Sequence, residues 1–135
     1  KPYAIFSSPF DRVLFLDPDV MALRDPTYLF DTNAFKTYGA LFWPDFPTTS
    51  PRNPIWKIAN ISYHYEREFE SGIIAINKQH PGILRALSLS VHICAHASYY
   101  FSYIYGDKDA FRWAFKMSKT PYFLNPNYLS SLGLL

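Results

Sequence analysis

The sequence predicts an α/β fold in which a small sheet is flanked by helices. Three short apolar runs, at residues 13–16, 40–42 and 72–76, have the length and composition of buried strands. Segments with apolar residues three or four positions apart, at 81–97 and after residue 105, have helical spacing. Because strands and helices alternate, we expect a layered α/β domain, in which some strand pairs could still be antiparallel. The 135 residues suffice for one domain with one core.

The first third of the chain contains a helix end, a strand and a short helix. Residues 3–8 are expected to end a helix, and the strand at 13–16 follows after a turn. Asp25 can cap a helix that begins at Pro26, because the carboxylate accepts from free backbone N–H groups and proline has none to satisfy. This short helix is expected to direct three residues inward: Tyr28, Leu29 and Phe30.

Two further strands occupy the middle of the chain. The strand at 40–42 is expected to end at residues 43–45, which include a proline and an aspartate. The proline-rich stretch 46–57 is expected to lack regular structure, either as a substrate lid or as an insertion loop. Glu70 and Ser71 precede the third strand, at 72–76.

The last third is predicted to be mainly helical. A helix is expected from Pro81 to about Ala97, with an apolar face formed by Ile83, Leu84, Leu87, Val91, Cys94 and Ala95. The last helix is expected to begin at Tyr105-Gly106-Asp107, with two phenylalanines, at 111 and 115, one turn apart. Residues 122–124 are predicted to form a final strand.

Composition and charge exclude several classes of protein. Hydrophobic residues make up 49% and aromatic residues 19% of the chain, which excludes a disordered segment. The net charge is +2 and the basic residues are scattered, so no nucleic-acid partner is expected. Cys94 is the single cysteine, which excludes a disulfide framework or a cysteine-based zinc site within this chain. No apolar run approaches the roughly 18 residues of a transmembrane helix, so we expect any membrane anchor to lie outside the chain.

The most informative motif is Asp17-Pro18-Asp19, at the carboxyl end of the predicted strand 13–16. Ligands of open α/β sheets bind at this end of the strands. Two carboxylates suit a hard divalent cation, such as Mn²⁺ or Mg²⁺, that carries a phosphorylated substrate. Pro18 fixes φ and stiffens the turn that holds them. A plain turn is the commoner outcome for the tripeptide alone, but the buried strand before it favours a site.

Further acidic residues lie beside the other predicted strands. Asp45 follows the second strand and Glu70 precedes the third. A glutamate that enters a buried strand loses hydration unless it faces a cleft or a partner, such as Arg67 or another base. Gly72 would let a ligand approach the backbone closely. Asp45, Glu70 and Gly72 are therefore candidate site residues.

Two clusters in the helical part allow a structural and a functional interpretation. Asp107 and Asp109 flank Lys108 at a helix start, where carboxylates either cap free N–H groups and favour the helix dipole or carry function. His92 and His96 are four residues apart, as zinc ligands can be. They lack the glutamate of the H-E-x-x-H motif, which favours a packed or solvent-facing pair.

Four blocks of sequence, taken in order, resemble one family of enzymes. The blocks are V-L-F-L-D-P-D-V-x-x-L-R-D-P-x-Y-L-F, G-A-L-F-W-P-D, E-S-G and Y-G-D-K-D-A-F-R-W-A. Together, over residues 1–124, they are similar to the fungal Golgi α-mannosyltransferases of glycosyltransferase family 71. The first block is also similar, more distantly, to the retaining transferases of family 8, such as glycogenin-like enzymes, in which glutamine stands in place of Lys108.

The resemblance implies a GT-A fold with a mixed sheet, a GDP-mannose donor, a glycan acceptor and a Mn²⁺ or Mg²⁺ cofactor. By the resemblance, Asp19 would bind the metal directly, and Asp17 would lie near both the ribose and the metal. The implied catalytic residues, which would line the donor-sugar or acceptor pocket, are Glu70, Asp107 and Asp109. The implied substrate-binding residues are Asp17, Trp43, Asp45, Gly72 and Lys108.

The resemblance further implies that residues 1–135 are the C-terminal part of a single GT-A-like catalytic domain. The N-terminal nucleotide-binding part would then be missing, and the isolated chain is expected to be inactive. The implied location is the Golgi lumen, within a type II membrane protein. Two alternatives remain: a catalytically inactive or carbohydrate-binding fragment, and a glycoside hydrolase that uses a Glu/Asp pair and no metal.

Overall fold

The structure, a computed structural model, describes residues 1–127 and is built around a four-stranded mixed sheet. The strand order is β1-β3-β2-β4; β1 and β2 both run antiparallel to β3, and β4 runs parallel to β2. The strands are β1 (Arg12–Leu16), β2 (Ala40–Thr48), β3 (Arg67–Asn77) and β4 (Phe123–Leu124). The predicted α/β class with a mixed sheet flanked by helices is confirmed. Residues 128–135 of the predicted domain lie outside the described residues.

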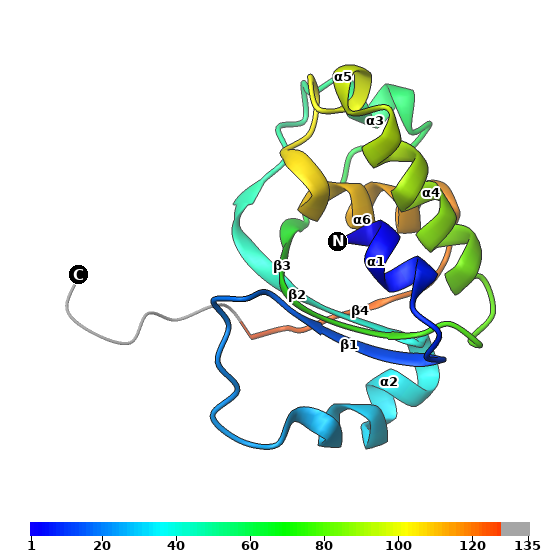
Figure 1. The fold of residues 1–135 in the computed structure, drawn as a ribbon. Helices are drawn as coiled ribbons and strands as arrows, with labels where there is room; N and C mark the ends of the chain where they lie inside the picture. Colours follow the sequence, from blue (N-terminus) through cyan, green and yellow to red (C-terminus); the bar gives the residue numbers. More distant parts are fainter. Residues whose placement is uncertain (128–135) are drawn as a thin grey trace.

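Helices cover both faces of this sheet (Figure 1). On one face lie α1 (Pro2–Ser7), α4 (Ile83–Ala95) and α6 (Gly106–Met117), with α3 (Ile55–Ile58) and α5 (Ala97–Tyr100) at the far end of this layer. The other face is covered by the 3₁₀ helix η1 (Pro26–Asp31) and by α2 (Asn33–Tyr38). Within residues 1–127, no helix combines the length and the apolarity that a membrane crossing requires.

The core on the α4/α6 face is aliphatic and aromatic. Ile74 and Ile76 of β3 pack there against Leu87 of α4 and Phe111 of α6, all with 0% of their surface exposed. Burial of each such side chain contributes about 1.5–3 kcal/mol. This core fixes the position of α6 relative to the central strand.

The pairing of β2 with β3 is irregular near the point where β1 ends. Leu41 pairs with Ala75, but Trp43 pairs with Glu70, so a step of two positions along β2 corresponds to a step of five positions along β3. A bulge of this kind bends the strand and redirects its side chains. Ser71 and Gly72 lie within it, next to the carboxyl end of β1.

Two strands are longer than predicted. β3 begins at Arg67, so Glu70 lies inside the strand and not before it. β2 continues to Thr48, although it contains Pro44 and Pro47. β4 pairs with β2 only at residues 41 and 42. The two prolines therefore lie on an edge of the sheet, where a missing N–H donor costs nothing.

The N-terminal helical segments differ in part from the prediction. Asp25 does cap the helix that begins at Pro26, and its Oδ1 accepts from the Thr27 backbone N–H at 3.0 Å. The helix is 3₁₀, however, and Tyr28 is 44% exposed instead of pointing inward. The stretch 46–57, expected to be irregular, contains the end of β2 and the single turn of α3.

The apolar face of α4 is rotated by about one residue from the predicted face. Its buried residues are Ile83, Ala86, Leu87, Ser90 and Ile93. Leu84 is 51% exposed and Ala95 is also exposed, so both were wrongly assigned to this face. Two small residues of this face, Ala86 and Ser90, are fully buried, and α4 packs closely against α6 and α1.

Candidate functional site

The Asp17-Pro18-Asp19 motif forms a tight turn directly after β1. The Asp17 backbone N–H donates to the Gly72 carbonyl oxygen (2.8 Å), which extends the β1–β3 ladder by one bond. The Val20 N–H donates to the Asp17 carbonyl oxygen (3.0 Å) and closes the turn. The Asp17 side chain is 20% exposed, whereas Asp19 is exposed to solvent. The turn therefore presents one partly buried and one open carboxylate at the end of a strand.

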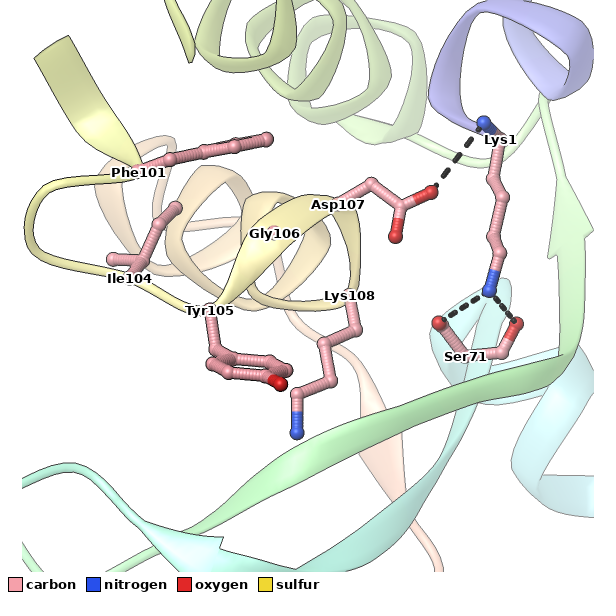
Figure 2. A pocket seen from close by; sticks show the side chains of 8 residues that line it. All are labelled: Lys1, Ser71, Phe101, Ile104, Tyr105, Gly106, Asp107 and Lys108. Atoms are coloured by element: carbon pink, nitrogen blue, oxygen red, sulfur yellow. Dashed lines mark hydrogen bonds and ion pairs between the residues drawn. The ribbon is translucent and has the colours of Figure 1, made fainter. Parts of the chain in front are cut away.

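Lys1 holds the carboxylate of Asp17. Its Nζ lies 2.6 Å from Asp17 Oδ2 and donates to Ser71 Oγ at 2.9 Å. Figure 2 shows the ammonium group directed at Ser71, across from the start of α6. Neither Lys1 nor Ser71 is among the predicted site residues. No local pattern identifies them, because Lys1 and Ser71 are 70 positions apart and only the packing of α1 beside β3 joins them.

Glu70 and Gly72 lie on the other side of the Asp17 carboxylate. Glu70 Oε1 accepts from the Gly72 backbone N–H at 2.5 Å. A Cβ atom placed on Gly72 would lie 3.0 Å from Glu70 Oε1 and 3.9 Å from Asp17 Oδ2. The structure thus brings three candidate site residues together: Asp17, Glu70 and Gly72. A side chain at residue 72 would also meet Val20 Cγ2 at 3.2 Å.

A pocket of about 480 Å³ adjoins this cluster at the N-terminus of α6 (Figure 2). Its walls include Lys1 and Ser71 on one side and Tyr105, Asp107 and Lys108 on the other. Lys1 and Ser71 belong to both features, so the pocket and the Asp17 turn form one continuous site. A pocket of this size suits a small polar ligand such as a sugar unit.

Lys108 of α6 forms an ion pair with Asp45 of β2. Its Nζ lies 2.5 Å from Asp45 Oδ2 and 3.4 Å from Glu68 Oε2. Burial acts to lower the pKa of Lys108, but the hydrogen bond and the charge of Asp45, together with Glu68, outweigh it and raise the pKa. Lys108 is therefore a fixed positive charge in the pocket wall. Asp45 and Lys108, two predicted site residues, meet as partners.

Asp109 is buried beneath the same helix start, with 1% of its surface exposed. Its Oδ2 accepts from the Tyr105 backbone N–H at 2.8 Å, while no hydrogen-bond partner for Oδ1 lies among residues 1–127. Burial, with the nearby charge of Glu68, raises the pKa of Asp109 to about 6. This is the geometry of the capping interpretation, in which Asp109 positions the Tyr105–Gly106 turn that lines the pocket.

Trp43 lies apart from the Asp17 turn. With Tyr28 and Phe123 it lines a separate cavity of about 290 Å³ between β2 and the η1/α2 layer. Trp43 is paired with Glu70 in the β2–β3 ladder, but its side chain lines this separate cavity and not the pocket at the start of α6. His92 and His96 pack against each other with ring centroids 4.1 Å apart, and His96 Nδ1 lies 2.9 Å from the His92 carbonyl oxygen.

The donor atoms of the turn fit a hard cation. Asp17 and Asp19 supply carboxylate oxygens, and the ammonium of Lys1 already occupies a cation position on Asp17. Among the described residues, no group of three or more His, Cys, Asp and Glu side chains is arranged to hold a metal. Mg²⁺ and Mn²⁺ sites in proteins that act on phosphorylated substrates commonly use one or two carboxylates and complete the shell with water and phosphate. The residues present fit that type of site.

Comparison with known proteins identifies the family. The chain is 38% identical over 65 residues to the α-1,2-mannosyltransferase MNN21 of Candida albicans. This match covers 48% of the chain and 8% of MNN21. It is 41% identical over 54 residues to MNN2 of Candida albicans, also an α-1,2-mannosyltransferase, and this match covers 38% of the chain and 9% of MNN2. It is also 37% identical over 46 residues to the α-1,2-mannosyltransferase MNN5 of Saccharomyces cerevisiae. This match covers 34% of the chain and 8% of MNN5. The matched segments thus span less than a tenth of the length of these relatives.

The model of one protein family matches the whole length of the chain in two overlapping parts. The parts cover residues 1–68 and 58–135, and the family, Mannosyl_trans3, is described as a mannosyltransferase family. These matches include the Asp17 turn, Glu70 and the start of α6. The chain belongs to the Mannosyl_trans3 family of mannosyltransferases.

Proposed function

We propose that this chain forms part of the catalytic domain of a metal-dependent α-mannosyltransferase that transfers mannose from GDP-mannose to a glycan acceptor. The observation that carries the proposal is the Asp17-Pro18-Asp19 turn at the carboxyl end of β1, continuous with the pocket at the start of α6. Relatives of the chain are named α-1,2-mannosyltransferases, which supports the reaction class.

In this proposal the exposed carboxylate of Asp19 is the principal ligand of Mn²⁺ or Mg²⁺, and Asp17 supports it. A divalent cation supplies positive charge that stabilises the diphosphate leaving group as the glycosidic bond breaks. Pro18 keeps both carboxylates on one rigid turn. The absence of a side chain at Gly72 lets the Glu70 carboxylate and the Asp17 turn lie close to the backbone of β3, because a Cβ atom there would be 3.0 Å from Glu70 Oε1 and 3.2 Å from Val20 Cγ2.

The residues of the pocket divide into contact and positioning roles. Asp107 and Glu70 are the carboxylates we assign to the donor sugar or the acceptor hydroxyl. Lys108 and Asp45 hold each other in place and present a fixed charge pair beside them. Asp109 acts through the Tyr105–Gly106 turn, because its own carboxyl group is buried.

The proposal extends to the cellular setting of the whole protein. We place the site in the Golgi lumen, within a type II membrane protein whose anchor lies outside this chain. The part of the enzyme that holds the nucleotide would also lie outside it, so the 135 residues alone are expected to be inactive.

Asp19→Asn in the full-length protein tests the function. Transfer of mannose from GDP-mannose in the presence of Mn²⁺ should fall by about a hundredfold or more, because a neutral amide is a poor ligand for a hard cation. The melting temperature should stay unchanged, since Asp19 is exposed. Asp31→Asn, which neutralises another exposed carboxylate, is the matched control and should retain activity.

Calorimetric titration of GDP-mannose with and without Mn²⁺ gives an independent readout. Metal-dependent binding that disappears in Asp19→Asn supports the proposal. Full activity of Asp19→Asn, or activity that a chelator leaves untouched, contradicts it and favours a reaction that needs no metal.

A further inference from the structure

The contact between Lys1 and Asp17 is a partly desolvated ion pair inside the proposed metal site. Lys1 Nζ lies 2.6 Å from Asp17 Oδ2, and the two side chains are 23% and 20% exposed. A second bond, to Ser71 Oγ at 2.9 Å, holds the ammonium from the strand side, and Ser71 is only 5% exposed. Exposed ion pairs contribute little, but a charge-assisted pair with a second buried partner is held in one geometry.

We propose that Lys1 is a built-in counter-ion that occupies Asp17 until a divalent cation displaces it, so that the metal binds tightly only together with the diphosphate. This inference rests on the proposed function, because it assumes that the Asp17-Pro18-Asp19 turn is the metal site. It assigns a role to a residue outside the four motif blocks.

Lys1 and a divalent cation compete for the same carboxylate. A Mg²⁺ ion bound by Asp17 would lie about 2.0–2.1 Å from a carboxylate oxygen, whereas Lys1 Nζ is 2.6 Å from one. A doubly charged ion and an ammonium group would then be separated by only a few ångströms, and their repulsion weakens the binding of the metal alone. The metal must either displace Lys1 or bind against its charge.

The ammonium group of Lys1 has a second binding partner, Ser71, that can hold it after it leaves Asp17. Ser71 Oγ and the Ser71 carbonyl oxygen lie 2.9 and 3.5 Å from Lys1 Nζ, so the group stays tethered when Asp17 is released. Lys1 also lines the pocket at the start of α6. A diphosphate in that space brings negative charge that offsets the repulsion. Metal and nucleotide are therefore expected to bind with positive coupling that depends on Lys1.

Titration of Mn²⁺ into the full-length protein, with and without GDP, tests the inference without any measurement of activity. In Lys1→Met the affinity for Mn²⁺ alone should rise by about tenfold or more, because the competing charge is gone. The gain in Mn²⁺ affinity on adding GDP should shrink correspondingly. Lys1→Arg keeps the charge and should bind Mn²⁺ no more tightly than the wild type. Lys36→Met, at an exposed position of α2, is the control for loss of a positive charge elsewhere.

The variants separate this inference from the proposed function. If Asp19→Asn leaves Mn²⁺ affinity unchanged, the metal site itself is wrong and both proposals fail. If Asp19→Asn abolishes Mn²⁺ binding while Lys1→Met binds Mn²⁺ no more tightly than the wild type, the role of Lys1 is overturned and the function stands. Lys1→Gln, which can keep the bond to Ser71 without the charge, replaces Lys1→Met if the latter does not fold, and the same increase in affinity is expected.

Discussion

The carboxyl group of Asp109 lies almost fully buried at the start of α6, where one oxygen accepts from the Tyr105 N–H and burial raises its pKa to about 6. An unfolded aspartate has a pKa of about 3.9. The folded state therefore binds the proton more tightly, and stability falls as the pH rises from about 4 to about 6. Above pH 6 the free energy of unfolding is lower than at pH 4 by a constant amount, on the order of 2–3 kcal/mol.

Asp109→Asn should remove this deficit, because the amide oxygen can still accept from Tyr105 and carries no charge. At pH 8 the free energy of unfolding should exceed that of the wild type by up to about 2 kcal/mol, and the difference should vanish near pH 4. Urea denaturation over this pH range measures it. Asp107→Asn removes a charge from the same helical turn at a more exposed site and controls for the helix dipole. A constant difference across the pH range would contradict the prediction.

Single residues were predictable from the sequence where their chemistry depends on close neighbours. Asp17 and Asp19 follow an apolar run directly, and Asp25 precedes a proline, so the strand-end turn and the cap could both be inferred. Lys1 and Ser71 could not, since their contact is made by tertiary packing alone.

At the scale of the elements, two glycines show how loops join the helices to their neighbours. Gly39 ends α2 in the left-handed region (φ +67°), and its N–H donates to the Phe35 carbonyl oxygen at 2.8 Å. A Cβ atom there would lie 2.4 Å from His80 Cβ. Gly106 begins α6 with a similar φ of +69°, but among residues 1–127 no atom beyond its own helix and chain neighbours lies within 4 Å of its added Cβ.

Gly39→Ala should therefore destabilise the protein more than Gly106→Ala. The left-handed conformation alone costs an alanine about 1–2 kcal/mol, which is the whole effect expected at Gly106. At Gly39 the overlap with His80 adds about 1–3 kcal/mol. Free energies of unfolding from urea denaturation give the comparison. Equal losses in the two variants would show that the loop at His80 moves away without cost.

Helices and strands were predictable where a run of apolar residues or a periodic apolar pattern was present. The residues at which they begin and end were not predictable. The strands at 13–16 and 72–76 and the two long helices all exist, because four or more periodic apolar residues identify them. The six residues of α2 carry too little pattern to be recognised. The extension of β3 back to Arg67 includes Glu68 and Glu70, whose burial depends on partners from α6 and the bulge.

For the whole molecule, the sequence predicted the fold class but not the order of the strands. β3 lies at the centre between β1 and β2 although it follows both in the chain. That order depends on which apolar faces cover each other, and no local pattern records it. The same holds for the site, since α1, β1, the bulge of β3 and the start of α6 each contribute one part of it (Figure 1).

A buried charge network joins the same distant segments at the other end of α6. Arg112 has 0% of its surface exposed; its Nε donates to Glu66 Oε1 at 3.0 Å and its Nη1 to Thr49 Oγ1 at 2.7 Å. Lys116 Nζ lies 2.8 Å from Glu66 Oε1, and the Tyr122 hydroxyl donates to Glu66 Oε2 at 2.7 Å. Burial acts to raise the pKa of Glu66, but these partners outweigh it and lower the pKa. Glu66 is thus an ionised carboxylate at the centre of three cationic or donor groups.

Arg112→Met should cost about 3–5 kcal/mol of unfolding free energy, because it removes a buried cation from Glu66 and the donor to Thr49 Oγ1. The double variant Glu66→Gln/Arg112→Met should be less destabilised than the sum of the two single variants, since each single variant already loses the ion pair between Glu66 and Arg112. A double-mutant cycle by urea denaturation measures this coupling. Additive losses would mean that Glu66 and Arg112 do not stabilise each other, and that their ion pair does not help to position the helix that carries Lys108 and Asp109.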